Sequence, residues 1–412
     1  MTIASLESLS FGIARTVEAA AAAGHRLCLL TGDRGVYRHE LAELPADALD
    51  IVDIDTTDES SVRRVLGALP GLAGLINTTD TWSTPAAELA AAYGLPGPDP
   101  AAVRLLRDKA EVRRALHRAG VSTRTAVDVD AHPDSAARVL EAVGLPAVLK
   151  DSSGTSSRAV WIVRDADALR AALAEAADVP LKGRLFAEPF LSGPLYSAET
   201  LSWAGEIRLL GVSSRLTSRT PAVREEGAAF PVALPAAERD GIEDWIRRVL
   251  AAAGHDQGFA HVEFVLTARG PELVEINRRI GGALIGEALC RTLDTNVYEA
   301  LIDVTLGRRP ALLDADPAAL TGAGPAVAFV LVYPDRPGVL VDWEGLDGLD
   351  AFPGGIEWYP VREPGDWLPD LGDQRGCTGM VLAEAATAEL AQHRAWSAAT
   401  TVRPVMKSAE GA

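Results

Sequence analysis

The chain has 412 residues, of which 48% are hydrophobic and 23% are charged. This is the composition of a globular protein and excludes a fibrous or wholly disordered chain. The length predicts two or three domains, because single hydrophobic cores stop growing at roughly 250–300 residues. The formal net charge is −18, from 39 Lys and Arg against 57 Asp and Glu, so neither nucleic acid nor an anionic membrane, which bind clustered cations, is an expected partner.

The three cysteines (Cys28, Cys290 and Cys377) are odd in number and form no CxxC pair, which argues against a disulfide framework and a thiolate zinc site. The first ten residues lack the basic start and apolar stretch of a signal peptide. No run approaches the roughly 18 apolar residues of a membrane span. We therefore expect a cytoplasmic protein.

Residues 1–97 are expected to form an α/β domain. An alanine-rich helix over 13–23 stops at Gly24, and a short buried strand follows over 26–31. The alternation continues with a helix at 58–68, a strand at 72–77 and a helix at 85–93. Such alternation predicts a parallel sheet covered on both faces, and the turn-rich 95–100 segment predicts its boundary.

Residues 98–310 are expected to form an α+β domain that begins with a helix containing Lys109 and ending at Gly120. The expected strands are 146–150, 158–163, 184–188, 196–203, 206–214, 258–266 and 271–277, and the expected helices are 236–253, 283–293 and 295–306. From about residue 325 onward Pro and Gly are dense and strands are short, as at 326–333. Residues 311–412 are therefore predicted to be a small β-rich segment.

Two segments contain residues suited to phosphate and metal chemistry, although the chain has neither a GxxxxGK[ST] nor a GxGxxG motif. The first is an apolar strand that ends in Lys150 and runs into a loop of small hydroxyl residues around Gly154. Amides and hydroxyls of such a loop can bind phosphate oxygens, and the lysine adds a positive charge. A surface hairpin with a solvated lysine is the alternative, and this segment alone favours neither.

The second segment is a predicted hairpin with Glu263 on one strand and Glu275 and Asn277 on the next. A period of two places Glu275, Asn277 and Arg279 on one face if the strand continues. Carboxylates amid apolar residues are costly unless compensated, and two carboxylates with an amide are oxygen ligands that suit Mg²⁺ together with substrate phosphates. The alternative is a structural ion pair between Glu275 and Arg278 or Arg279.

The sequence Glu275-Ile-Asn-Arg-Arg-Ile-Gly-Gly282 resembles the Glu-Ile-Asn-Pro-Arg motif and following Gly pair of the ATP-grasp superfamily, specifically its carboxylate–amine ligases such as bacterial L-amino-acid (dipeptide) ligases and carnosine synthase. The resemblance covers roughly residues 10–310, and 311–412 weakly. It implies an ATP-grasp fold with an N-terminal α/β domain, a central two-lobed ATP-binding region whose flap lobe spans about 122–190, and a C-terminal β-rich segment packed on this core.

The resemblance also implies site residues. Glu263, Glu275 and Asn277 would bind Mg²⁺, with Mn²⁺ as an alternative metal, and Arg279 would stabilise the transferring phosphate. Lys109 and Lys150 would hold the ATP phosphates under a flap loop at 152–157. The further ATP contacts implied are Ser153, Gly154, Ser156, Glu188, Pro189, Phe190 and Leu191.

The sequence departs from the family pattern at two positions. Leu195 stands where many members carry an acidic residue that binds the ribose, so either Glu199 substitutes for it or ribose recognition is looser. Arg278 replaces the common proline, and would either meet a substrate carboxylate or pair with a glutamate of the site.

Three further positions, Glu225, Gly281 and Gly282, are expected on the substrate side. Glu225 resembles a glutamate near the amino-acid substrate of dipeptide ligases, and a solvated loop charge beside Glu226 is the alternative. His261 would share a strand face with Glu263, although a core histidine is the preferred interpretation.

The activity implied is an ATP-dependent ligation. ATP would phosphorylate the carboxylate of an amino acid or small acid, and an amine would attack the acyl phosphate to give a dipeptide-like amide, ADP and phosphate. A carboxylase that uses bicarbonate and a non-catalytic ATP-binding regulatory protein are the alternatives. The expected partners are small-molecule carboxylates and amines, and the sequence permits a homodimer.

Overall fold

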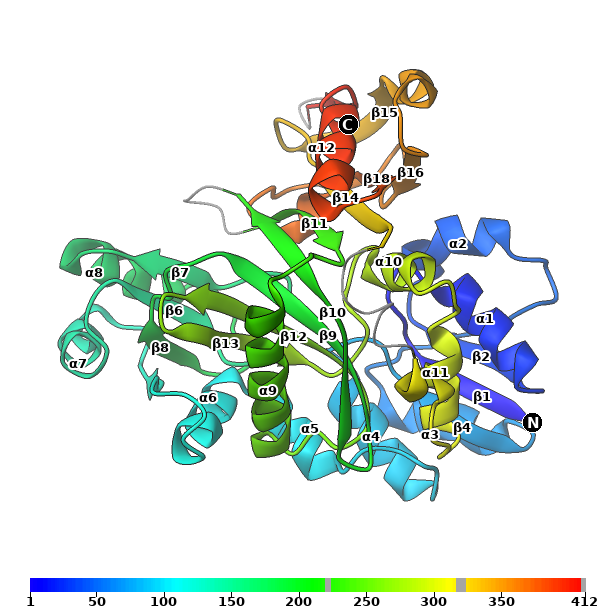
Figure 1. The fold of residues 1–412 in the computed structure, drawn as a ribbon, viewed down its shortest axis with the longest axis horizontal. Coiled ribbons are helices and arrows are strands. Elements are labelled where there is room, and N and C mark those ends of the chain that lie inside the picture. Colours follow the sequence, from blue (N-terminus) through cyan, green and yellow to red (C-terminus); the bar gives the residue numbers. More distant parts are fainter. Residues whose placement is uncertain (219–223, 316–323, 409–412) are drawn as a thin grey trace.

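The computed structural model describes residues 1–218, 224–315 and 324–408. Figure 1 shows the N-terminal elements on the right, a small lobe with β6, β7 and β8 on the left, and the C-terminal elements at the top, with the long strands β9, β10 and β12 between them. None of the helices in these residues has the length and apolar content needed to cross a membrane.

The N-terminal region is a four-stranded parallel sheet in the order β3-β2-β1-β4. Its strands are β1 (Thr2–Leu6), β2 (Arg26–Thr31), β3 (Asp50–Asp53) and β4 (Leu72–Ile76), and its helices are α1 (Ile13–Ala22), α2 (Arg38–Glu43), α3 (Glu59–Ala68) and α4 (Ser83–Ala92). Alternate residues of β2 enter different cores: Leu27 and Leu29 pack with α1, and Cys28 and Leu30 pack with α3 and α4. The predicted parallel sheet covered on both faces is confirmed, although β1 and β3 were not predicted.

The single helix expected around Lys109 is in fact two helices, α5 (Pro100–Arg107) and α6 (Lys109–Arg118). Asp108 separates them with an extended backbone, and its carboxylate accepts hydrogen bonds from the amides of Ala110 and Glu111. This side-chain cap starts a new helix at Lys109, because it satisfies amides that have no partner within the helix.

A second sheet of four antiparallel strands, in the order β5-β8-β6-β7, forms the small lobe. Its strands are β5 (Val127–Asp128), β6 (Ala147–Asp151), β7 (Val160–Val163) and β8 (Leu185–Pro189), and its helices are α7 (Ala136–Ala142) and α8 (Ala166–Ala176). Apolar residues from both helices and from β6 to β8 form one core. The loop between β6 and β7 therefore projects from a firmly packed lobe.

The largest sheet has eight strands in the order β13-β12-β9-β10-β11-β14-β18-β16, and each neighbouring pair is antiparallel. The strands are β9 (Leu195–Trp203), β10 (Glu206–Thr217), β11 (Glu225–Phe230), β12 (Gly258–Thr267), β13 (Gly270–Asn277), β14 (Ala326–Val332), β16 (Glu357–Pro360) and β18 (Gly379–Ala385). The associated helices are α9 (Ala236–Ala252), α10 (Ile285–Thr292), α11 (Tyr298–Thr305) and α12 (Ala388–Ala399). Ala260, Val262 and Phe264 of β12 pack against α9, which turns His261 and Glu263 to the opposite face.

The C-terminal residues are less separate than the sequence suggested. Three of their strands, β14, β18 and β16, extend the large sheet, because β14 pairs with β11. The remaining strands, β15 (Gly338–Glu344), β17 (Trp367–Leu368) and β19 (Arg403–Lys407), form a small sheet of their own. The segment also contains α12, which was not predicted, and the division into 1–97, 98–310 and 311–412 stays a prediction.

Candidate active site

A cavity of about 480 Å³ lies where the three regions meet. Its walls come from the loop after β4, the loop between β6 and β7, the end of β8, the β12–β13 hairpin and the C-terminal strands. Fourteen of the predicted site residues line it: Lys109, Lys150, Gly154, Ser156, Glu188, Pro189, Phe190, Leu191, Glu225, Glu263, Glu275, Asn277, Arg279 and Gly282. Residues far apart in the sequence thus surround one space.

The carboxylates of the hairpin face the cavity in register. Glu263 on β12 lies opposite Glu275 on β13, and His261 lies opposite Asn277. The Glu275 carboxylate accepts a hydrogen bond from the Asn277 amide at 2.8 Å, and its other oxygen lies 2.9 Å from the Lys109 Nζ atom. The strand register therefore brings two carboxylates and one side-chain amide to the same wall of the cavity.

The oxygen atoms of these three side chains fit the ligand preference of a magnesium ion. Mg²⁺ is usually held by one or two carboxylates together with substrate phosphates, rather than by a cage made only of protein groups. In the described part of the chain, no group of three or more His, Cys, Asp or Glu side chains is placed to hold a metal ion. Glu263, Glu275 and Asn277 are the residues that would hold it.

The two predicted phosphate lysines are already paired with acidic groups. Lys109 also donates a hydrogen bond to the Gly154 carbonyl at 2.7 Å, which connects α6 to the loop after β6. The Lys150 Nζ atom lies 2.6 Å from one oxygen of Glu188, and the Arg113 guanidinium lies 2.8 Å from the other. Both lysines are thus held at the cavity wall before any nucleotide binds.

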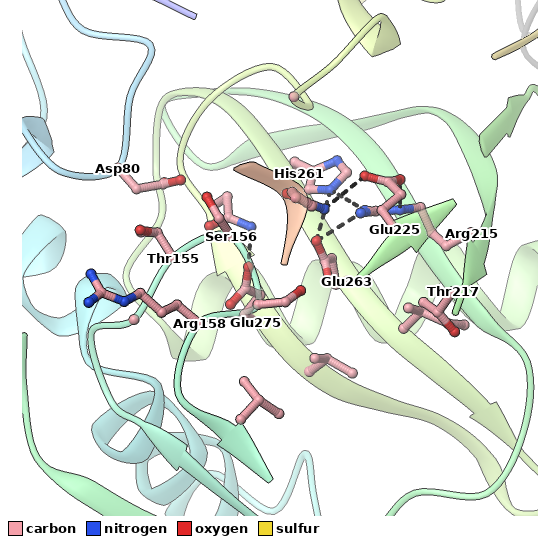
Figure 2. A pocket seen from close by; sticks show the side chains of 18 of the residues that line it. Asp80, Thr155, Ser156, Arg158, Arg215, Thr217, Glu225, His261, Glu263 and Glu275 are labelled. Atoms are coloured by element: carbon pink, nitrogen blue, oxygen red, sulfur yellow. Dashed lines mark hydrogen bonds and ion pairs between the residues drawn. The ribbon is translucent and has the colours of Figure 1, made fainter. Parts of the chain in front are cut away.

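A second charged group, formed by Arg215, Glu225, His261 and Glu263, gathers on one side of the cavity, with Asp80, Thr155 and Arg158 on the other (Figure 2). Arg215 on β10 lies 2.6 Å from Glu225 and 3.0 Å from Glu263. Burial would raise the pKa of Glu263, but Arg215 and His261 hold it well below its usual range. Glu263 is therefore an anion that can face a metal.

Glu225 belongs to strand β11 and is only 8% exposed, so its interpretation as a solvated loop charge is wrong. Burial raises its pKa, against the opposing effect of Arg215. Its second oxygen accepts a hydrogen bond from the Gln374 amide at 3.1 Å. Leu331, Val361, Cys377 and Met380 line the cavity together with Gln374. The C-terminal segment thus forms part of the cavity wall.

Family models match two parts of the chain. Residues 143–287 match the ATP-grasp domain, and residues 330–407 match the L-amino acid ligase C-terminal domain 2. Residues 143–287 thus form an ATP-grasp domain. The predicted fold class and the resemblance stated from the Glu275–Gly282 motif are confirmed.

Solved structures show the same fold for this ATP-grasp protein. The L-amino acid ligase from Bacillus licheniformis superposes with a TM-score of 0.82 at 18% identity, over 99% of both chains. A phosphoribosylglycinamide synthetase from Anaerococcus prevotii gives 0.73 at 15% identity, over 98% of this chain and 99% of that one. At such identities the similarity establishes the fold and leaves the substrates open.

Two proteins of known sequence are similar to this chain over different lengths. A protein of Sinorhizobium fredii called uncharacterized protein y4rH is 27% identical over 374 residues, which is 87% of this chain and 73% of that one. Carnosine synthase 1 of Gallus gallus is 30% identical over 321 residues, or 72% of this chain and 34% of that one. The chain therefore matches about a third of the length of that carnosine synthase.

The structure corrects two expectations about side chains of this ATP-grasp protein. Glu199 does not line the cavity: it is 2% exposed, and its carboxylate is bound by His261 at 2.9 Å and by the hydroxyls of Ser197 and Ser213. It therefore supports His261 instead of substituting for an acidic residue at Leu195. His261 in turn lines the cavity, so its interpretation as a core histidine is wrong. Burial would lower the pKa of His261, but the Glu199 carboxylate raises it to about 9.

Arg278 is also placed differently from either expectation. Its guanidinium donates to the Gln257 carbonyl at 2.9 Å, is partly buried, and does not line the cavity. Burial lowers its pKa to about 10, with Asp256 opposing the shift. Strand β13 ends at Asn277, and the next two arginines leave it in different directions, so Arg278 meets neither a glutamate of the site nor the cavity.

Gly281 and Ser153 lie beside the cavity without lining it. A Cβ atom on Gly281 would lie 2.6 Å from Ile285 Cγ2 and 2.8 Å from His261 Nδ1. A side chain there would displace one of these neighbours, so the glycine serves the close packing around His261. Ser153 belongs to the loop after β6, where its amide is bound by the Asp151 carboxylate at 2.9 Å.

The sequence analysis did not identify three residues of the site. Asp80 and Arg215 line the cavity, and Arg113 forms an ion pair with the cavity residue Glu188. Asp80 had a usable signal, because it follows β4 at the carboxyl end of a parallel sheet, where ligands of open α/β sheets commonly bind. Arg113 on α6 had none, because its partner Glu188 lies 75 residues away. Arg215 on β10 also had none, because its contacts to Glu225 and Glu263 depend on how β10 and β12 lie in the sheet.

The buried ion pairs of Glu188 give a stability prediction. Burial would raise the pKa of this carboxyl, but Arg113 and Lys150 hold it below the ordinary value of 4.5. We expect Glu188→Gln to lower the free energy of unfolding at pH 7 by about 3–5 kcal/mol, because it leaves two buried cations without their anion. Denaturant unfolding of the two proteins measures this difference.

The same variant has an expected pH dependence. A depressed folded-state pKa stabilises the protein fully above about pH 4.5, and this contribution is lost as the pH falls below that value. The stability difference between the wild type and Glu188→Gln should therefore shrink on acidification. Glu272→Gln is the control, because Glu272 is half-buried on β13 and is bound by the Ser122 hydroxyl. A difference independent of pH would contradict the ion-pair interpretation.

Proposed function

We propose that the protein is an ATP-dependent ligase that phosphorylates the carboxylate of an amino acid or other small acid and couples the acyl phosphate to an amine. The products would be a dipeptide-like amide, ADP and phosphate. One observation carries the proposal: the cavity that holds Lys109, Lys150, Glu275 and Arg279 is completed by Gln374 and its neighbours, which belong to the segment matching the L-amino acid ligase C-terminal domain 2.

The cations of the cavity suit phosphoryl transfer, which depends on positioning and on stabilisation of charge spread over the transferring oxygens. Lys109 and Lys150 approach from α6 and β6, and Arg279 approaches from the loop after β13. Each is held by an acidic partner, namely Glu275, Glu188 and Asp80 in turn. Little reorganisation is then needed when a triphosphate enters. A magnesium ion bound at Glu263, Glu275 and Asn277 would neutralise charge on the phosphates.

An acyl phosphate is hydrolysed by water, so the site must close during the reaction. The loop that contains Gly154, Thr155 and Ser156 lines the cavity and can serve as its cover. It is held at two adjacent residues, by the Lys109 contact to the Gly154 carbonyl and by Lys182, whose ammonium donates to Thr155 at 3.1 Å. These contacts favour a cover that closes over bound nucleotide.

The proposal is tested by ATP-dependent phosphate release with Mg²⁺ across pairs of common amino acids and small carboxylic acids, with mass spectrometry of the products. We expect release that requires a carboxylate and an amine and that yields their amide. Release with bicarbonate alone would identify a carboxylase, a reaction type found among the structural neighbours. Nucleotide binding without turnover across the whole panel would indicate a regulatory ATP-binding protein.

A further inference from the structure

The loop after β4 connects the N-terminal sheet to the proposed phosphoryl-transfer centre. Asp80 in this loop lies against Arg279, which is 199 residues later in the chain. One Asp80 oxygen accepts hydrogen bonds from Arg279 Nη2 at 2.6 Å and from Nε at 3.0 Å. The two side chains are only 13% and 14% exposed, and both line the cavity. Such a charge-assisted contact with two hydrogen bonds fixes the plane of a guanidinium.

The loop itself is anchored within the N-terminal region. The Asn77 amide donates to the Leu6 carbonyl at the end of β1 and to the Thr79 hydroxyl. The Trp82 indole donates to the Thr56 carbonyl at 3.3 Å, and the Ser83 hydroxyl donates to the Asp80 carbonyl at 2.9 Å. Asp80 is therefore presented by a support that does not depend on Arg279.

Arg279 has alternative anions close by. Glu263 and Glu275 line the same cavity as Arg279. These two carboxylates are the proposed metal ligands. A guanidinium released from Asp80 would be drawn toward them, because unlike charges attract strongly in a partly buried site. The only other hydrogen bond described for its guanidinium is to the adjacent Ile280 carbonyl, at 3.0 Å.

We propose that Asp80 is a positioning residue, which holds Arg279 in the cavity and apart from Glu263 and Glu275. The N-terminal region would then supply part of the phosphoryl-transfer machinery, beyond its packing role. This inference rests on the proposed function, in which Arg279 stabilises the transferring phosphate.

The test compares Asp80→Asn with Asp80→Glu, Arg279→Met and the double variant, using Asp47→Asn, an exposed residue of the same region, as the control. We expect Asp80→Asn to lower the kcat of phosphate release about 10- to 100-fold, with the KM of each substrate changed less than about threefold, because a misplaced catalytic group mainly reduces kcat. Asp80→Glu should recover part of this loss. In the Arg279→Met background, Asp80→Asn should have no further effect.

Three outcomes would overturn the inference. They are a higher kcat in Asp80→Asn, a raised KM for an amino acid at unchanged kcat, and losses that multiply in the double variant. Thermal unfolding of every variant distinguishes a folding defect from these results, and Asp80→Glu keeps the test open if Asp80→Asn does not fold.

A binding measurement separates this inference from the proposed function. Calorimetry with Mg²⁺ gives the dissociation constants of ADP and of a non-hydrolysable ATP analogue. We expect the preference for the analogue to fall about threefold or more in Asp80→Asn and Arg279→Met alike, and an unchanged preference in Asp80→Asn would contradict the inference. A wild-type protein that shows this preference but forms no amide would contradict the proposed function alone.

Discussion

Replacing Arg279 with methionine is expected to lower the kcat of ATP-dependent phosphate release about 1,000-fold, while the affinity for ATP changes only a few fold. The reason is that a fixed guanidinium stabilises charge that develops on the transferring phosphoryl group, and groups of this kind contribute roughly 10³–10⁵ in related phosphoryl transfers. Methionine retains much of the length of the side chain and removes the charge. Steady-state kinetics with a substrate pair from the screen would measure the loss.

Arg269→Met is the matched control for this variant. Arg269 is exposed at the turn of the same β12–β13 hairpin, at the end away from the cavity, so its loss should leave the kcat unchanged. A kcat that stays within about threefold of wild type in Arg279→Met would show that this arginine does not act on the transferring phosphate. A similar loss in both variants would instead indicate a general effect of charge.

Glu275→Gln is expected to reduce the rate of phosphate release by about 100-fold or more, and to raise the Mg²⁺ concentration needed for half-maximal activity. Groups that only support metal ligands already contribute about 10–100-fold, so the loss of a ligand should exceed this. The substitution keeps the shape of the side chain and its contact with Asn277, but it removes the anion beside Lys109. A magnesium titration of phosphate release measures both effects.

The control for this prediction is Glu272→Gln, three residues earlier on the same strand. Glu272 accepts a hydrogen bond from Ser122 and does not line the cavity, so the magnesium requirement should be unchanged. Phosphate release that survives Glu275→Gln with an unaltered magnesium requirement would remove this residue from the metal site. The carboxylate would then be only the structural partner of Lys109.

Much of the fold could be predicted from local patterns. The alternation of helices and strands before residue 97 predicted a parallel sheet, because such units can bury their apolar faces only against one another. The strand period of two correctly placed Glu275 and Asn277 on one face. It also placed His261 beside Glu263, but whether that face met a core or a cavity depended on α9, which covers the opposite side of β12.

The misplaced residues share a cause. Arg278 replaces the proline of the family pattern, and Glu199 was expected to substitute for the acidic residue missing at Leu195. Packing gave each a different partner, Gln257 for Arg278 and His261 for Glu199. Similarly, the extension of the large sheet by the C-terminal strands depends on the pairing of β11 with β14, which residue spacing does not indicate.

The shared face of Glu275 and Asn277 could be predicted from their spacing, because a strand assigns each residue to a face by its position alone. The two lysines were expected from the family resemblance. The pairs Asp80–Arg279 and Arg215–Glu225, and the wall supplied by Gln374, could not be predicted from the sequence. Asp80 and Arg279 lie 199 residues apart, Gln374 and Glu225 lie 149 residues apart, and Arg215 and Glu225 lie on separate strands. The order in which the strands pair and the helices pack brings these groups within a few ångströms of one another.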